Sequence, residues 1–153
     1  IIKTKKGAVI ALEGELGAGK TVFVKGFAKA LGIKSKIKSP TFVLMKKYTV
    51  AKSLKLKAVS LYHLDCYRVG SHKDLKIPEL KEIIHESHNM SFTTSHGSRK
   101  RPQRYATHQK ASHNVVVIEW AERVRKILPK KHLTVHIDHI SRNERKIQIS
   151  KPK

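Results

Sequence analysis

Residues 14 to 21 read Gly14-Glu-Leu-Gly-Ala-Gly-Lys-Thr21 and match the phosphate-binding pattern G-x-x-x-x-G-K-[ST] at every fixed position. Gly14 and Gly19 allow the backbone to wrap so tightly that successive N–H groups point inward at an anion. Lys20 is expected to reach the β- and γ-phosphates as a point charge, and the Thr21 hydroxyl is expected to be a ligand for Mg²⁺. We predict that the whole loop binds a nucleotide, the intervening residues being Glu15, Leu16, Gly17 and Ala18.

The sequence on both sides of this loop fits the interpretation. Residues 8–12 form a short continuous apolar run, which is typical of a buried parallel strand. Residues 20–31 place apolar side chains at helical spacing, and Gly32 is a natural C-terminal stop. Strand, loop and helix in this order aim the N-terminus of the helix at the anion. The alternative is a glycine-rich turn that binds nothing, and the matching flanks argue against it.

Length and composition narrow the class of protein. A chain of 153 residues has the size of one domain, so we predict a single domain over residues 1–153. No run approaches the roughly 18 apolar residues of a membrane span, and no signal peptide precedes the first predicted strand. The single cysteine, Cys66, excludes an internal disulfide and suits a reducing compartment. We therefore expect a cytoplasmic protein with no membrane association.

The charge of the chain is strongly unbalanced. Lys and Arg total 33 against 11 Asp and Glu, which gives a formal net charge of +22. Such a balance favours a polyanionic partner, and RNA is the obvious candidate. Because aromatic residues make up only 6% of the chain, no base-stacking platform stands out. The composition predicts RNA contact without sequence-specific recognition, and a generally basic surface is the alternative.

Apolar patterns predict further elements along the chain. We expect strands at 41–45, 58–65 and 114–118, helices at 78–85 and 120–128, and an antiparallel hairpin of 133–137 with 146–149 that has one face in solvent. Together with the first strand and helix, this order predicts an α/β fold, a three-layer P-loop NTPase-like domain with a mixed β-sheet.

Residues 86–113 differ in character from the rest. They are rich in Ser, His, Lys and Arg and lack apolar periodicity, so we interpret them as a flexible basic surface insertion. Several of the ten histidines fall in or beside this stretch, at irregular spacing: His85, His88, His96, His108 and His113. A structural zinc site needs fixed ligand geometry, so the pattern favours adventitious metal binding instead.

A phosphate-binding loop needs acidic partners, and this chain has few acids. Glu119 directly follows the apolar run 115–118, at the position where ligands gather beyond the carboxyl ends of parallel strands. Asp65 ends the strand predicted from Ala58 in the same way. We favour a functional role for Glu119, whereas strand position alone leaves Asp65 undecided. Trp120, the only tryptophan, would either border the nucleotide or pack in the core.

Four motifs in order carry a family resemblance: Leu-Glu-Gly-Glu-Leu-Gly-Ala-Gly-Lys-Thr (12–21), Ser-Pro-Thr-Phe-Val-Leu (39–44), His-Leu-Asp-Cys-Tyr-Arg (63–68) and Val-Ile-Glu-Trp-Ala-Glu-Arg (117–123). Together they closely resemble the TsaE (YjeE) family, the ATPase of bacterial tRNA threonylcarbamoyladenosine biosynthesis. The resemblance covers roughly residues 7–85 and 114–150.

The resemblance implies a role for each matching residue. Thr41 resembles a switch residue that senses the γ-phosphate of ATP. Asp65 would act near the metal or the attacking water, and Glu119 would complete the Mg²⁺ site with Thr21. Trp120 would border the pocket. Lys20, Asp65 and Glu119 are then the expected catalytic residues, and Thr21, Glu119 and Asp65 are the expected residues of the metal site. Family members couple ATP hydrolysis to turnover of a tRNA-modifying complex that contains TsaB and TsaD.

Two other functions remain open from the sequence. A small P-loop kinase acting on a nucleoside or another small acceptor would use an arginine-rich lid, and three arginines of the insertion supply candidates, namely Arg99, Arg101 and Arg104. A non-enzymatic RNA-binding protein would keep the loop only as a phosphate clamp. The intact Lys20, Thr21 and Glu119 argue against the second alternative.

Overall fold

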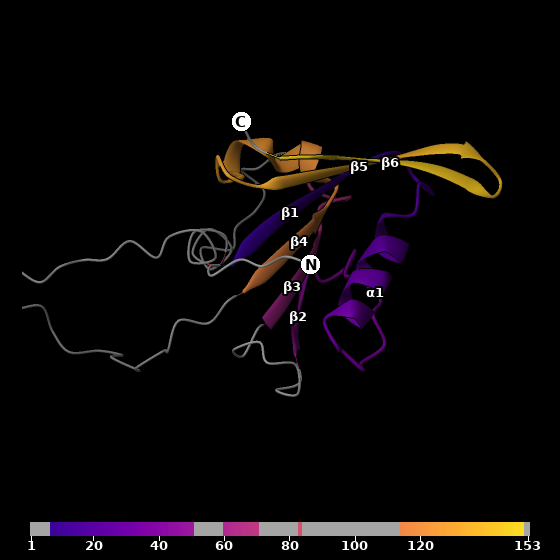
Figure 1. The fold of residues 1–153 in the computed structure, drawn as a ribbon. Coiled ribbons are helices and arrows are strands. Elements are labelled where there is room, and N and C mark those ends of the chain that lie inside the picture. Colours follow the sequence, from indigo (N-terminus) through magenta and orange to yellow (C-terminus); the bar gives the residue numbers. More distant parts are fainter. Residues whose placement is uncertain (1–6, 51–59, 71–82, 84–113, 152–153) are drawn as a thin grey trace, which may run out of the picture.

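The computed structural model describes residues 7–50, 60–70, 83 and 114–151. Along these residues the elements are β1 (Ala8–Glu13), α1 (Lys20–Ala30), β2 (Met45–Thr49), β3 (Ser60–Asp65), β4 (Val115–Glu119), the 3-10 helix η2 (Ala121–Ile127), β5 (Leu133–Ser141) and β6 (Glu144–Ser150). The strands form one six-stranded sheet in the order β2-β3-β4-β1-β5-β6 (Figure 1).

The sheet has a parallel centre and antiparallel edges. β3, β4, β1 and β5 run parallel, while β2 pairs with β3 and β6 with β5 in the antiparallel sense. The predicted mixed sheet is therefore confirmed. β1, which precedes the phosphate-binding loop, lies between β4 and β5, so the loop emerges near the middle of the sheet.

Side chains that alternate along the central strands build a core on each face. Ile10 and Leu12 of β1 pack with Val24 and Ala28 of α1, whereas Val9 and Ala11 pack on the face that holds η2. Because both faces of the sheet are covered, the sequences of these strands are continuously apolar instead of alternating between apolar and polar residues. A helix on each side of the sheet gives the three layers that the sequence predicts.

The first helix matches its prediction closely. α1 begins directly after Gly19, whose φ of 109° is disfavoured for residues with a side chain. It ends before Gly32, with a φ of 74°, and the N–H of Ile33 donates to the carbonyl of Ala28 at 3.0 Å. This is the glycine-terminated helix end expected from the sequence.

The strand predicted over 41–45 is wrong. Residues 41–44 form a turn, closed by the N–H of Val43 donating to the carbonyl of Pro40 at 2.9 Å, and the strand β2 begins only at Met45. Phe42 and Val43, whose apolar character suggested a strand, are 82% and 60% exposed. The physical reason lies in hydrogen bonds to Asp65, which hold the turn.

Two further predictions need correction near the C-terminal end. The helix expected over 120–128 is a 3-10 helix that begins after Trp120 and is kinked at Val124. The hairpin is present, but β6 is exposed along its whole length instead of having one buried face. Ile147 and Ile149, on the strand side that continues the core of β5, are 51% and 62% exposed.

Several predictions lie outside the described residues. These are the start of the strand at 58–59, the insertion 86–113 with its histidines, and the helix 78–85 except for Ile83, which is helical and packs against the η2 side of the core. Within the described part of the chain, no helix is long and apolar enough to cross a membrane.

Candidate nucleotide-binding site

The candidate site lies where β1, β3 and β4 end, on the face of the sheet that α1 covers. Leu61 of β3 and Val117 of β4 belong to the core beneath α1. Because strand side chains alternate, His63, Asp65 and Glu119 point to this same face, and Asp65 lies opposite Glu119 in the parallel register. The sheet thus brings two strand-end carboxylates next to the phosphate-binding loop.

Lys20 is enclosed by the loop that precedes it. Its Nζ donates to the carbonyl oxygens of Gly14 at 2.5 Å and Glu15 at 2.8 Å, and lies 3.7 Å from the centre of the Trp120 ring. Burial lowers the pKa of Lys20 below its ordinary value, and the carboxylate of Glu122 is the strongest of three that oppose this. The direct hydrogen-bond partners of the Lys20 ammonium group are therefore loop carbonyl oxygens and not carboxylates.

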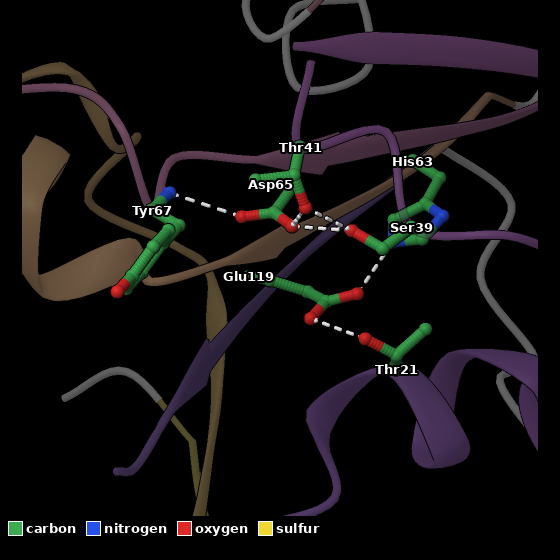
Figure 2. Close-up of polar contacts among 7 residues, drawn as sticks. All are labelled: Thr21, Ser39, Thr41, His63, Asp65, Tyr67 and Glu119. Carbon is green, nitrogen blue, oxygen red and sulfur yellow. Dashed lines mark hydrogen bonds and ion pairs between the residues drawn. The ribbon is translucent and has the colours of Figure 1, made fainter. Parts of the chain in front are cut away.

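Glu119 joins β4 to the first turn of α1 and to β3. One carboxylate oxygen accepts a hydrogen bond of 2.8 Å from the Thr21 hydroxyl, and the other lies 2.7 Å from Nε2 of His63 (Figure 2). Glu119 is 2% exposed and His63 is fully buried. These two contacts replace the water that a buried carboxylate has lost. Because each contact engages a different oxygen, together they fix the orientation of the Glu119 side chain.

Asp65 holds a different segment of the chain. One carboxylate oxygen accepts hydrogen bonds from the hydroxyls of Ser39 and Thr41, the latter at 2.6 Å, and the other accepts the N–H of Tyr67 at 2.9 Å (Figure 2). The backbone N–H of Asp65 in turn donates to the carbonyl of Leu44 at 3.0 Å. The turn of residues 39–44 is therefore fastened to Asp65 at both of its ends.

The two non-glycine residues with positive φ in the described chain both adjoin these carboxylates. They are Leu44, with a φ of 63°, and Trp120, with a φ of 59°. This backbone conformation costs of the order of 1 to 3 kcal/mol for such residues and is characteristic of sites whose geometry is constrained. The ring centres of Trp120 and Tyr67 are 5.1 Å apart, and Nζ of Lys20 also contacts the indole ring, so the indole packs against both Tyr67 and Lys20.

The structure brings most of the predicted site together. Lys20, Thr21, Glu119 and Trp120 meet at the loop, and Thr41 with Asp65 forms the neighbouring cluster. Of the four intervening loop residues, Ala18 is buried, while Glu15, Leu16 and Gly17 are exposed.

Sequence reasoning missed two residues of the site, His63 and Ser39. His63 is a polar residue in a buried strand, two positions before Asp65 and therefore on its face, and that position was the available signal. Nδ1 of His63 is buried without a hydrogen-bond partner among the described residues. Ser39 carries no such periodic signal, because its role depends on a contact with a residue 26 positions away.

A phosphate-binding loop between β1 and α1, with a carboxylate at the end of β4 bonded to its threonine, defines a P-loop nucleotide-binding protein. Comparison with known proteins narrows this class. Residues 1–94 match the family model described as "Threonylcarbamoyl adenosine biosynthesis protein TsaE".

Individual relatives agree with the family model. The tRNA threonylcarbamoyladenosine biosynthesis protein TsaE of Treponema pallidum is 33% identical over 146 residues, which cover 95% of this chain and 84% of that protein. The TsaE protein of Bacillus subtilis is also 33% identical, over 94% of this chain and 69% of that protein. The crystal structure of Bacillus subtilis YdiB superimposes with a TM-score of 0.62 at 28% identity, covering 99% of this chain and 72% of that one. The chain belongs to the TsaE family.

Proposed function

We propose that this chain is a Mg²⁺-dependent ATP hydrolase that acts in tRNA threonylcarbamoyladenosine biosynthesis in the cytoplasm, together with TsaB and TsaD. Membership of the TsaE family supports the pathway. The observation that carries the proposed chemistry is the 2.8 Å hydrogen bond between the Thr21 hydroxyl and the buried Glu119 carboxylate. It joins the residue that ends the phosphate-binding loop to the acid at the end of β4.

The donor atoms at this point fit Mg²⁺. The Thr21 hydroxyl and the Glu119 carboxylate are hard oxygen ligands, and Mg²⁺ is commonly bound by one or two protein ligands completed by phosphate oxygens and water. Within the described residues there is no cluster of three or more His, Cys, Asp or Glu side chains that could hold a metal ion by itself. We therefore propose a site in which the nucleotide supplies the remaining ligands, with Asp65 acting near it.

The proposed roles follow from the contacts of each residue. Lys20 would exchange its bonds to the loop carbonyls for phosphate oxygens, while the loop N–H groups cradle the phosphates. The bound Mg²⁺ would neutralise charge that develops on the phosphate oxygens. Thr41 would contact the γ-phosphate, which requires it to leave the carboxylate of Asp65. Loss of that bond would leave one carboxylate oxygen of Asp65 with fewer partners and able to accept from the attacking water.

This exchange offers a physical basis for partner-stimulated turnover. Asp65 accepts three hydrogen bonds from the 39–44 turn and Tyr67, so its oxygens are occupied in the structure. A protein that draws the turn away from Asp65 would release the carboxylate for catalysis. The exposed tip of the turn, Phe42 and Val43, is available for such a contact. We also propose that the chain, with its net charge of +22, contacts tRNA through its basic residues.

The test is ATP turnover by the purified chain alone, with the TsaB–TsaD pair, and with the pair plus tRNA. We expect slow turnover alone and a clear increase with the pair, which Lys20→Ala abolishes. Lys25→Ala is the matched control, because Lys25 is an exposed lysine of the same helix. Turnover that the pair leaves unchanged would contradict the coupling. Consumption of ATP only when a nucleoside or similar acceptor becomes phosphorylated would support the kinase alternative instead.

A further inference from the structure

The hairpin of β5 and β6 contacts the phosphate-binding loop at a point that the proposed chemistry leaves unused. Nε of Arg145, near the start of β6, donates to the carbonyl oxygen of Ala18 at 3.1 Å, across 127 positions of sequence. Nη1 of the same guanidinium donates to the carbonyl oxygens of Ser141 at 2.7 Å and Glu144 at 2.8 Å. Arg145 thereby ties the turn of the hairpin to the middle of the loop.

A second contact fixes the hairpin against the start of the loop. A side-chain carbon at Gly14 would overlap the carbonyl oxygen of Ile137 in β5, so the two backbones meet with no space between them. β5 is also hydrogen-bonded along β1, where Glu13 lies opposite His136. The hairpin is therefore placed rigidly relative to Gly14, and its arginine meets the loop four residues further on.

The geometry of the peptide group gives the Arg145 contact a consequence for phosphate binding. In a planar trans peptide the C=O and the N–H point in opposite directions. Because Arg145 holds the Ala18 carbonyl oxygen toward the hairpin, the N–H of Gly19 points away from the hairpin. Inward-facing N–H groups are the anion-binding element of such loops.

The loop itself supplies little resistance to rotation of this peptide. The peptide turns about the ψ angle of Ala18 and the φ angle of Gly19, which is 109°, and a side-chain carbon at Gly19 would meet no atom within 4 Å. The N–H of Ala18 donates to the Glu15 carbonyl at 3.2 Å, but that bond holds the preceding Gly17–Ala18 peptide. Glycine visits both signs of φ at low cost, so the Ala18–Gly19 peptide can turn unless a bond holds it. The bond from Arg145 provides that restraint.

We propose that Arg145 is a positioning residue for nucleotide binding, which holds the Ala18–Gly19 peptide so that the Gly19 N–H faces the phosphate groups. The β5–β6 hairpin thus sets the affinity of the loop for nucleotide diphosphates and triphosphates alike. The inference rests on the proposed binding of ATP, and it adds a distant element of the fold to that site.

The experiment compares Arg145→Ala, Arg145→Lys and the control Arg142→Ala, an exposed arginine of the same hairpin turn. Calorimetry should show ADP and ATP affinity reduced by about tenfold in Arg145→Ala, the scale of one lost hydrogen bond from a charged donor. Arg145→Lys keeps the charge, but its single ammonium nitrogen lacks the planar fork of separate donor nitrogens that spans the Ala18 carbonyl and the turn carbonyls, so an intermediate affinity is expected. Arg142→Ala should bind like the wild type, and the melting temperatures without nucleotide should agree.

The outcomes separate positioning from other effects. Full nucleotide affinity in Arg145→Lys, or a loss in Arg142→Ala equal to that in Arg145→Ala, would overturn the proposal, because positive charge on the hairpin would then explain the affinity without any positioning of the peptide. A loss for ATP alone would indicate direct contact with the γ-phosphate and overturn the proposal. The backbone N–H signal of Gly19, followed by NMR without nucleotide, should shift in Arg145→Ala but not in Arg142→Ala, and an unmoved signal would overturn the inference. Absence of ATP binding by the wild type would contradict the proposed function separately.

Discussion

Glu119 and Asp65 lie opposite each other at the ends of neighbouring parallel strands, yet their carboxylates hold different parts of the chain. Glu119 is bonded to Thr21 of α1 and His63 of β3, which are parts of regular elements. Asp65 is bonded to Ser39 and Thr41 of an irregular turn. Two equivalent strand-end acids thus hold a rigid region of regular elements in one case and, in the other, an irregular turn that we propose to be releasable.

The largest effect is expected where the acid is held by regular elements. Glu119→Gln keeps the shape and can still accept from Thr21, but it removes the charge proposed to bind Mg²⁺. Turnover with the TsaB–TsaD pair should fall by about a thousandfold, because the metal contributes several kcal/mol of transition-state stabilisation. Steady-state ATPase assays measure this loss of turnover.

Glu13→Gln is the matched control for that variant. Glu13 also ends a strand, β1, but its partners are Arg125 and His136, whose side chains are 67% and 42% exposed. Such exposed pairs contribute little, so turnover should stay near the wild-type value. Equal turnover in Glu119→Gln and Glu13→Gln would remove Glu119 from the proposed site.

The second effect concerns the releasable region. Asp65→Asn retains an acceptor for the Tyr67 N–H but loses the charge proposed to orient water. Turnover should fall by roughly a hundredfold, at the low end for loss of a positioned base. Unlike Glu119→Gln, this variant should keep normal Mg²⁺-dependent ADP binding, which calorimetry can check. If Mg²⁺-dependent binding is lost as well, the two acids act as one metal site and the comparison fails.

The difference between the regions also explains what the sequence could predict. Gly14, Gly19, Lys20 and Thr21 are constrained by a local backbone arrangement, so their pattern is visible within eight residues. Glu119 could be predicted from its place after a buried strand. The 39–44 turn could not, because hydrogen bonds to Asp65, more than 20 positions away, override the apolar strand pattern of Phe42 and Val43. The family resemblance marked Thr41 without giving this geometry.

A third, smaller effect is expected at His63, which supports Glu119 from β3. His63→Leu removes the contact to the carboxylate, whereas His63→Gln retains a side-chain N–H donor. Partners of metal ligands typically affect metal affinity by 10- to 100-fold, and we expect about tenfold weaker Mg²⁺ binding in the ADP complex of His63→Leu. Titration of Mg²⁺ into the ADP-bound protein measures this.

His63→Gln should recover a substantial part of that affinity if the donor is what matters. Both variants should bind metal-free ADP like the wild type, since the side chain of His63 is hydrogen-bonded to Glu119 and, among the described residues, not to Lys20 or Thr21. Mg²⁺ affinity that is unchanged in His63→Leu would show that Thr21 alone is sufficient to orient Glu119.

The smallest effect uses Cys66 as a reporter between the two regions. Cys66 directly follows Asp65 in the chain, and its thiol is fully buried. Its backbone N–H donates to the Glu119 carbonyl at 3.0 Å. Burial raises the pKa of Cys66 to about 12 from an ordinary value of 9.0. Since the thiolate is the reactive form, the raised pKa and the burial of the thiol together slow its reaction with a thiol reagent at neutral pH relative to the unfolded chain.

Cys66 should therefore be modified only when the end of β3 opens, and the rate reports which acid controls that opening. Ser39→Ala and Thr41→Val each remove one hydroxyl from Asp65, so both should raise the modification rate several-fold at neutral pH. Thr21→Val, which removes the hydroxyl from Glu119, should leave the rate near that of the wild type, because β4 and α1 remain packed. Faster modification in Thr21→Val than in the turn variants would reverse the assignment of the rigid and the releasable acid.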